Sequence, residues 1–149
     1  MTVKEYLHQA YRLDQKINSD LAELASLREM SLSVSSPQLT ERVQTSRKGD
    51  APFVRCIEKI IELETKINAE VDLLVELKKE IRGVITTVED TDERLVLKYR
   101  YVHNYTWEQI GNELHADSRT VRRWHGKALQ HVVMPENPVC IDKIKEGRP

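Results

Sequence analysis

The sequence predicts an all-α protein, with an N-terminal long-helix hairpin or coiled coil followed by a C-terminal three-helix helix-turn-helix domain. Residues that favour helices dominate the chain, which holds only 5 Gly and 5 Pro among 149 residues. Apolar residues recur at steps of three and four, the period of an amphipathic helix. With 5% aromatic and 32% charged residues, the composition favours long amphipathic helices over a deep globular core.

Residues 1–90 are predicted to form two long helices separated by a loop at about 31–51. The stripe of the first helix is Val3, Tyr6, Leu7, Ala10, Leu13, Ile17, Leu21, Leu24 and Leu27. The second helix is predicted to begin at Asp50 as its N-cap and to end near Thr86, with a heptad-like seam of Ile57, Ile60, Ile67, Val71, Leu74, Ile81 and Ile85. These stripes need a partner, which is either the other helix or a second copy of the chain. The acidic residues of 58–80 alternate with Lys, which is typical of a solvated face.

Residues 91–131 carry the start signals of three shorter helices. Thr91 or Asp92 can cap a helix that runs to about residue 102. Thr106 has Gln109 three residues on, which is a capping-box pattern, and Asp117 is a third N-cap candidate. Two short helices joined by a tight turn predict a helix-turn-helix over 91–131. Residues 132–149 are predicted to form an irregular tail.

The last predicted helix has one apolar and one basic side. The apolar contact with its neighbour is predicted to involve Ile110, Leu114, Val121 and Trp124. The helical period then turns Ser118, Arg119, Arg122 and Arg123 outward, with Lys127 near the same side. Such residues reach base edges when a helix lies in the major groove, and Arg can bond two guanine atoms at once.

Charge is distributed unevenly along the chain. The net charge is −1, but residues 1–90 hold 13 Lys and Arg against 16 Asp and Glu. Residues 115–131 hold four Lys and Arg against Asp117 alone. A basic patch at the contact matters more for binding a polyanion than the average over the chain, so this segment is the predicted double-stranded DNA contact.

Part of this segment resembles a known family. The stretch TWEQIGNEL at 106–114, followed by SRTVRR at 118–123 and KAL at 127–129, resembles the promoter-recognition helix-turn-helix (region 4) of bacterial primary sigma factors. The likeness covers about residues 91–131. It implies base or phosphate contacts for Ser118, Arg119, Thr120, Arg122 and Arg123. The usual glycine of the turn is replaced here by His115 and Ala116, so another residue must adopt the left-handed conformation.

The arrangement of the whole chain is similar to small phage-encoded regulators of late transcription, the ArpU and RinA groups. That likeness implies a phage or prophage origin and a site of action in the bacterial cytoplasm. No catalytic constellation, cofactor motif or metal-ligand spacing is present, so we expect neither an enzyme nor a cofactor or metal site. No apolar run approaches the length that spans a bilayer, and Cys56 and Cys140 suit a reducing compartment.

Three functions follow from these predictions. The first is a sequence-specific transcription regulator that binds promoter DNA, with the N-terminal helices forming a homo-oligomer (a dimer is favoured), contacting RNA polymerase, or both. The second is an adaptor that binds RNA polymerase as a sigma mimic with little DNA contact. The third is a phage packaging subunit of the small-terminase kind, which would assemble many copies.

Overall fold

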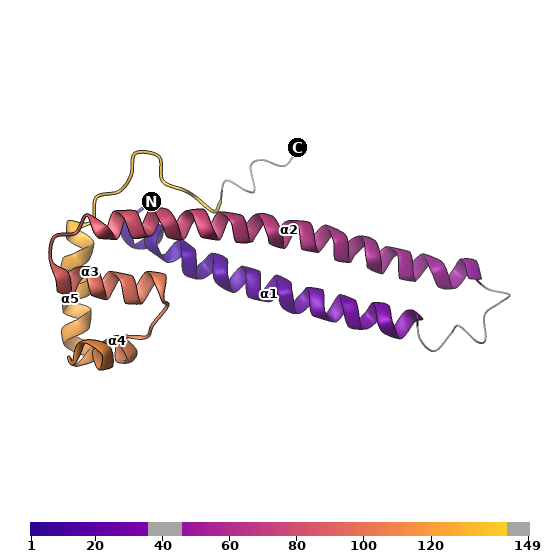
Figure 1. The fold of residues 1–149 in the computed structure, drawn as a ribbon, viewed down its shortest axis with the longest axis horizontal. Coiled ribbons are helices and arrows are strands. Elements are labelled where there is room, and N and C mark those ends of the chain that lie inside the picture. The colour runs from indigo at the N-terminus through magenta and orange to yellow at the C-terminus, as the bar shows by residue number, and fades with distance from the viewer. Residues whose placement is uncertain (36–45, 143–149) are drawn as a thin grey trace. The chain divides into compact units, whose positions relative to one another are not determined.

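A computed structural model of the protein describes residues 1–35 and 46–142, and every regular element in that part is a helix. The elements are α1 (Val3–Ser35), α2 (Ser46–Thr86), α3 (Thr91–Leu97), a π-helical turn (Lys98–Val102), α4 (Trp107–Leu114) and α5 (Ser118–His131) (Figure 1). The predicted all-α class is confirmed.

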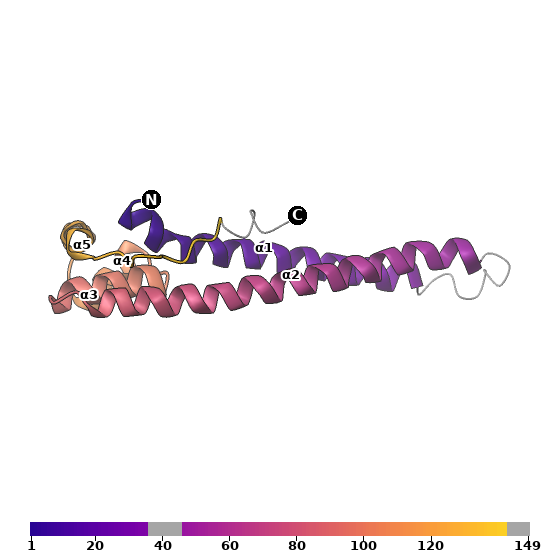
Figure 2. The same cartoon turned by 90° about the horizontal axis from the view of Figure 1, so that it is seen from above.

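The chain divides into two compact units. Met1–Asp14 and Leu73–Pro149 make up the first, which we call the terminal unit, and Gln15–Asp72 make up the second, the hairpin unit. Within each unit, segments of α1 and α2 pack antiparallel against each other (Figure 2). The long helices therefore pair within one chain, which the sequence left open.

The terminal unit has one core that combines the ends of the long helices with the short helices. Buried in it are Tyr6, Leu7 and Ala10 of α1, Leu77, Ile81, Val84 and Ile85 of α2, and Leu97, Tyr101, Val102 and Ala128 of the C-terminal helices. Residues 1–90 are thus not structurally separate from the helix-turn-helix. The first three turns of α1 and the last turns of α2 support it directly.

The described part of the predicted tail, residues 132–142, is irregular but attached to this core. The Gln9 side chain donates to the Val139 carbonyl and accepts from the Ile141 N–H, both at 3.0 Å. Glu80 Oε1 accepts the Val139 N–H at 3.0 Å and the Tyr6 hydroxyl at 2.6 Å. Residues 143–149 lie outside the described part.

The predicted loop and helix start need correction. Helix α1 continues to Ser35 and α2 already begins at Ser46, so residues 31–35 and 46–51 are helical and Asp50 is not an N-cap. The signal was misleading because Asp50 precedes Pro52, and proline favours the first turn of a helix. Here the helix instead continues on both sides of Pro52 and gives up one backbone hydrogen bond. The middle of the predicted loop, 36–45, lies outside the described residues.

Two predicted core residues of the hairpin unit face away from its core. The buried cluster is Leu24, Cys56, Ile60 and Ile67, with Leu27, Ile57 and Leu63 packed against it. Leu21 is 45% exposed and Val71 is 40% exposed. Both residues fit the three- and four-residue steps of the apolar stripe on their helix. Each stripe, however, is wider than the surface that the other long helix covers, so these residues stay exposed.

One acidic residue of 58–80 is buried rather than solvated. Glu70 is only 2% exposed, and Asp20, on the other helix, is 7% exposed. Lys66 Nζ lies 3.5 Å from Asp20 and 3.9 Å from Glu70, and Lys16 Nζ lies 3.8 Å from Glu70. Burial, followed by the hydrogen bond and repulsion from Asp20, raises the pKa of Glu70, while the two lysines oppose the shift.

Because the pKa of Glu70 is raised, we expect the hairpin unit to become less stable as pH rises. The folded state holds the Glu70 proton more tightly than the unfolded state, so stability is greatest below the ordinary pKa of 4.5 and falls as pH rises through the raised folded pKa. In thermal melts followed by circular dichroism, wild type should become less stable relative to Glu70→Gln as pH rises. The exposed control Glu62→Gln should behave as wild type. An unchanged pH response in Glu70→Gln would contradict the assignment.

Candidate nucleic-acid interface

Helix α4 is fixed at its start by the predicted capping box. The Gln109 N–H donates to Thr106 Oγ1 at 3.2 Å, and the Thr106 N–H donates to Gln109 Oε1 at 2.9 Å. Together these bonds satisfy two backbone donors that a helix start otherwise leaves to water. The helix then buries Ile110 completely in a cluster with Val96 of α3 and Val121 of α5. Leu114 and Trp124 pack against that cluster, so the predicted apolar contact is confirmed.

The turn after α4 depends on two residues with different tasks. His115 adopts the left-handed conformation, with φ 53° and ψ 44°, and so replaces the glycine that a sigma-like turn usually has. The Ala116 N–H donates to the Gly111 carbonyl at 3.0 Å. A Cβ atom on Gly111 would lie 2.5 Å from the Ala116 carbonyl oxygen. Gly111 therefore allows the close approach of the turn to α4.

The N-cap of α5 is Asp117, as predicted. The Thr120 N–H donates to Asp117 Oδ1 at 2.7 Å. This backbone bond, the Thr120 side chain, and the nearby charges of Arg119 and Arg123 lower the pKa of the Asp117 carboxyl, which stays ionised. For α3 the cap is Asp90, which accepts the Glu93 N–H at 3.0 Å, and neither Thr91 nor Asp92 serves as the cap.

The outward face of α5 carries the predicted cations. Arg119, Arg122, Arg123 and Lys127 are exposed, whereas Ser118 and Thr120 at the helix start are half-buried. Val121, His125 and Ala128 are buried on the opposite face. None of these four cations forms an ion pair with another residue in the described ranges. Their charge is therefore available to an external anion.

Sequence reasoning missed two further members of this face. Gly126 and Gln130 are exposed and follow Arg119 and Arg123 at steps of three and four. The helical period alone would have identified them. No atom lies within 4 Å of a Cβ built on Gly126, so the fold leaves open space there.

Arginines also flank Trp107. The Arg100 guanidinium lies 4.3 Å from the Trp107 ring centre and donates to the Tyr105 carbonyl at 3.0 Å. The Arg122 guanidinium lies 6.0 Å from the same ring, at the outer limit of a cation–π contact. Trp107 packs against the Val96–Ile110–Val121 cluster and is therefore a core residue. The face of its ring also makes cation–π contacts with the two arginines.

The helix-turn-helix is similar to a known protein family. Residues 90–132 match the family model for sigma-70, region 4. The match confirms the predicted sigma-like helix-turn-helix and supports a DNA-binding role for the segment. It covers less than a third of the chain, and the likeness to the ArpU and RinA groups stays a prediction. No curated protein and no solved structure matches the chain significantly.

Behind the exposed basic face of α5, the helix-turn-helix holds a buried histidine, His125. Burial, and then the charges of Lys4 and Arg100, lower the pKa of His125 to about 4. Burial raises the pKa of Tyr101 to about 12. The Tyr101 hydroxyl therefore stays protonated and shares a hydrogen bond of 2.6 Å with Nε2 of the neutral His125 ring. The Trp107 ring meets the His125 ring edge-on at 4.7 Å.

Acid should therefore destabilise the helix-turn-helix. The unfolded state binds a proton on His125 at pH 6.5 and the folded state only near 4, so stability is complete above 6.5 and falls by about 2 kcal/mol toward pH 4.5. Tryptophan fluorescence is a local probe, because the two tryptophans, Trp107 and Trp124, both pack in this unit. The Tyr101→Phe/His125→Leu variant removes both partners and should lose much of this acid response. An equal response in the variant would exclude His125 as the cause.

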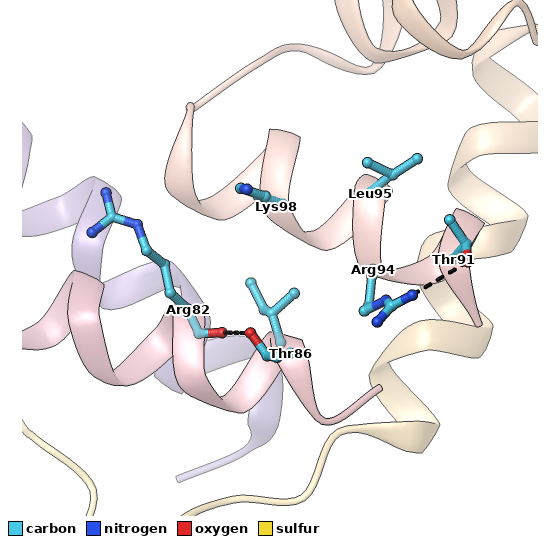
Figure 3. Close-up of a pocket in the computed structure, with 7 residues that line it drawn as sticks. Arg82, Thr86, Thr91, Arg94, Leu95 and Lys98 are labelled. Carbon is cyan, nitrogen blue, oxygen red and sulfur yellow. Dashed lines mark hydrogen bonds between the residues drawn. The ribbon is translucent and has the colours of Figure 1, made fainter. Parts of the chain in front are cut away.

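A cleft of about 380 Å³ lies on the other side of α3 (Figure 3). It is lined by Arg82, Ile85 and Thr86 of α2, Thr91, Arg94 and Leu95 of α3, and Lys98. The buried side of α3 meets α5 instead: Glu93 bonds His131 at 2.7 Å, and Val96 shares a cluster with Val121. The cleft and α5 thus occupy opposite faces of one helix. Three cations and two aliphatic side chains make the cleft suited to an acidic, partly apolar ligand.

Among residues 1–35 and 46–142, His, Cys, Asp and Glu nowhere form a group of three that could hold a metal ion. Within the same ranges, no helix combines the length and apolar character that crossing a membrane requires.

Proposed function

We propose that this protein is a sequence-specific transcription regulator, encoded by a phage or prophage, that binds promoter DNA in the bacterial cytoplasm. Helix α5 lies in the major groove, with Arg119, Arg122 and Arg123 toward base edges and Lys127 toward a phosphate. The observation that carries the proposal is the set of four exposed, unpaired cations on α5 of a region 4 unit. In this proposal, Ser118 and Thr120 at the start of α5 contact the DNA backbone. No catalytic step is part of this proposal.

The geometry of α4 and α5 supports this docking. Caps at Thr106 and Asp117 and the shared apolar cluster fix the two helices against each other, so the backbone that carries the outward cations needs little rearrangement on binding. The helix N-terminus adds partial positive charge, although ionised Asp117 offsets it. The recognition helix of a helix-turn-helix contacts bases through its N-terminal residues, which are the residues that are basic here.

The test begins with selection of duplexes from a random pool by the full chain. The selected duplex is then titrated by fluorescence anisotropy between about 50 and 200 mM salt. Each cation that neutralises a phosphate contributes about −0.9 to the slope of the log–log plot, so Lys127 alone predicts a slope of roughly −1 per chain, and every further phosphate contact makes it steeper. A flat salt response, or a pool without an enriched sequence, would reject the proposal.

A second candidate is the adaptor that binds RNA polymerase, and the cleft favours it. Arg82, Arg94 and Lys98 present positive charge beside Ile85 and Leu95, on the face of α3 away from α5. A polymerase segment held there would leave α5 uncovered, so DNA affinity separates this adaptor, which makes little DNA contact, from the promoter-binding regulator. Binding of purified polymerase should weaken in Arg82→Ala/Arg94→Ala and not in the exposed control Arg55→Ala/Lys59→Ala. Equal binding of both variants would remove the adaptor role from this cleft.

A further inference from the structure

The hairpin unit carries two rows of heptad spacing on α2: the first forms the core with α1, and the second is mostly exposed, although Ile57 in it also packs against that core. The first row packs against α1 and contains Cys56, Ile60, Leu63, Ile67 and Glu70. The second row follows the same three- and four-residue steps and contains Val54, Ile57, Ile61, Glu64, Asn68 and Val71. Val54, Ile61 and Val71 of this exposed row are 48%, 58% and 40% exposed. A row with this spacing is the pattern by which one helix packs against another.

Helix α1 has a matching exposed row, consisting of Asn18, Leu21, Ala25 and Arg28. In both helices the exposed row lies one residue, about 100°, further round the helix than the buried row, in the direction of increasing residue number. Because the helices are antiparallel, the same rotation turns both rows to one side of the hairpin. The ion pair between Arg28 and Glu64, at 2.7 Å, confirms it, since each residue belongs to an exposed row and the two side chains meet.

The two sides of the hairpin unit therefore differ in chemistry. The side opposite the exposed rows is rich in charge and carries Lys16, Glu23, Arg55, Lys59, Glu62 and Lys66. The side with the exposed rows carries aliphatic residues and only one charged pair, Arg28 with Glu64, which neutralise each other. A soluble two-helix hairpin has no reason to present aliphatic residues at heptad spacing to water, and such patches mark interaction sites.

We propose that a second copy of this chain covers this side, so that two hairpin units pack into a four-helix bundle. The side is neutral and apolar, so it is complementary to itself and brings no like charges together. Asn18 and Asn68 lie at the same level of the hairpin, because the contacts Lys16–Glu70 and Asp20–Lys66 flank them on both helices. A single polar level within an apolar seam is the device that sets register between self-associating helices.

Self-association of the full chain without DNA tests the proposal, so its outcome is independent of the DNA-binding proposal. Sedimentation equilibrium of wild type should show a dimer. Ile61→Lys places a charge in the middle of the interface and should raise the dissociation constant by roughly a hundredfold or more. The matched control Ala69→Lys adds the same charge to an exposed position outside the exposed row and should leave the dimer intact.

Val54→Lys serves as a second variant should Ile61→Lys lose helical circular dichroism. Dissociation in Val54→Lys with wild-type helicity supports the interface. A wild-type monomer at every concentration, or a ring of many copies, would overturn it. Equal weakening by Ile61→Lys and Ala69→Lys would also overturn it, because the effect would then come from charge and not from the exposed row.

Discussion

Replacing both Arg122 and Arg123 by alanine is expected to abolish sequence-specific DNA binding while the fold persists. Both side chains are exposed, and neither forms an ion pair with a described residue. A bidentate contact from Arg to guanine is worth about 1–3 kcal/mol, so two such contacts predict a loss of about 2–6 kcal/mol. Affinity for the selected duplex should therefore fall by at least about thirtyfold.

Fluorescence anisotropy with the selected duplex and with a scrambled duplex separates the two ways in which arginine acts. Loss of base contacts reduces the preference for the selected duplex, whereas loss of phosphate contacts weakens both duplexes equally and flattens the salt slope. The control Arg55→Ala/Lys59→Ala removes two exposed cations from the hairpin unit and should bind as wild type. Wild-type affinity in Arg122→Ala/Arg123→Ala would remove α5 from the DNA contact. The distant contact of Arg122 with Trp107 makes at most a small change in stability.

The helix-turn-helix could be predicted well because the sequence patterns that define its helices are local. A capping box, an N-cap aspartate and apolar spacing over eight to fourteen residues each depend on neighbours in the sequence. Thr106, Asp117 and Ile110 therefore lie where the sequence places them. The residue in the left-handed turn was harder to predict, because neither His115 nor Ala116 has the freedom of glycine at positive φ. His is several-fold enriched there among residues other than glycine, and His115 does adopt this conformation.

The long helices were harder to interpret because their apolar residues serve more than one surface. Leu21 and Val71 fit the period of a core stripe but lie in the exposed rows. Periodicity identifies an apolar stripe and does not state how many partners it contacts. For Glu70 the prediction was wrong in the other direction: its charge predicted an exposed side chain, but the side chain is buried beside Asp20. Only the position of the partner helix decides such cases.

The sharing of one core by the chain termini also could not be read from the sequence. Tyr6, Leu77 and Ala128 come from three distant parts of the chain and belong to one cluster. Each looks like an ordinary helical core residue in its own segment. Because these residues share one cluster, the helix-turn-helix packs directly against the N-terminal part of α1 and the C-terminal part of α2.

Substituting Gly111 by alanine is the stability change with the largest expected effect. The new methyl group would lie 2.5 Å from the Ala116 carbonyl oxygen, a distance that real Cβ atoms do not tolerate. The obstacle is backbone, so no side chain can rotate away, and the turn between α4 and α5 must move. We expect a loss of about 3 kcal/mol or more, since overpacking costs 1–3 kcal/mol and the bond from Ala116 to Gly111 is also strained.

Tryptophan fluorescence during urea unfolding measures this loss, because Trp107 and Trp124 pack on the cluster that the turn closes. Gly126→Ala is the matched control: it adds the same methyl group in open space on α5 and should stabilise the helix by up to about 1 kcal/mol. His115→Gly relieves the left-handed residue in the same turn and should stabilise by about 1 kcal/mol. Gly111→Ala with wild-type stability would mean that the turn is not as tight as this geometry requires. Gly126→Ala also tests where DNA approaches α5, because Gly126 is exposed on the same face of the helix as Arg119 and Arg123. If that variant is stable but binds DNA weakly, the open space above Gly126 is where the duplex approaches α5.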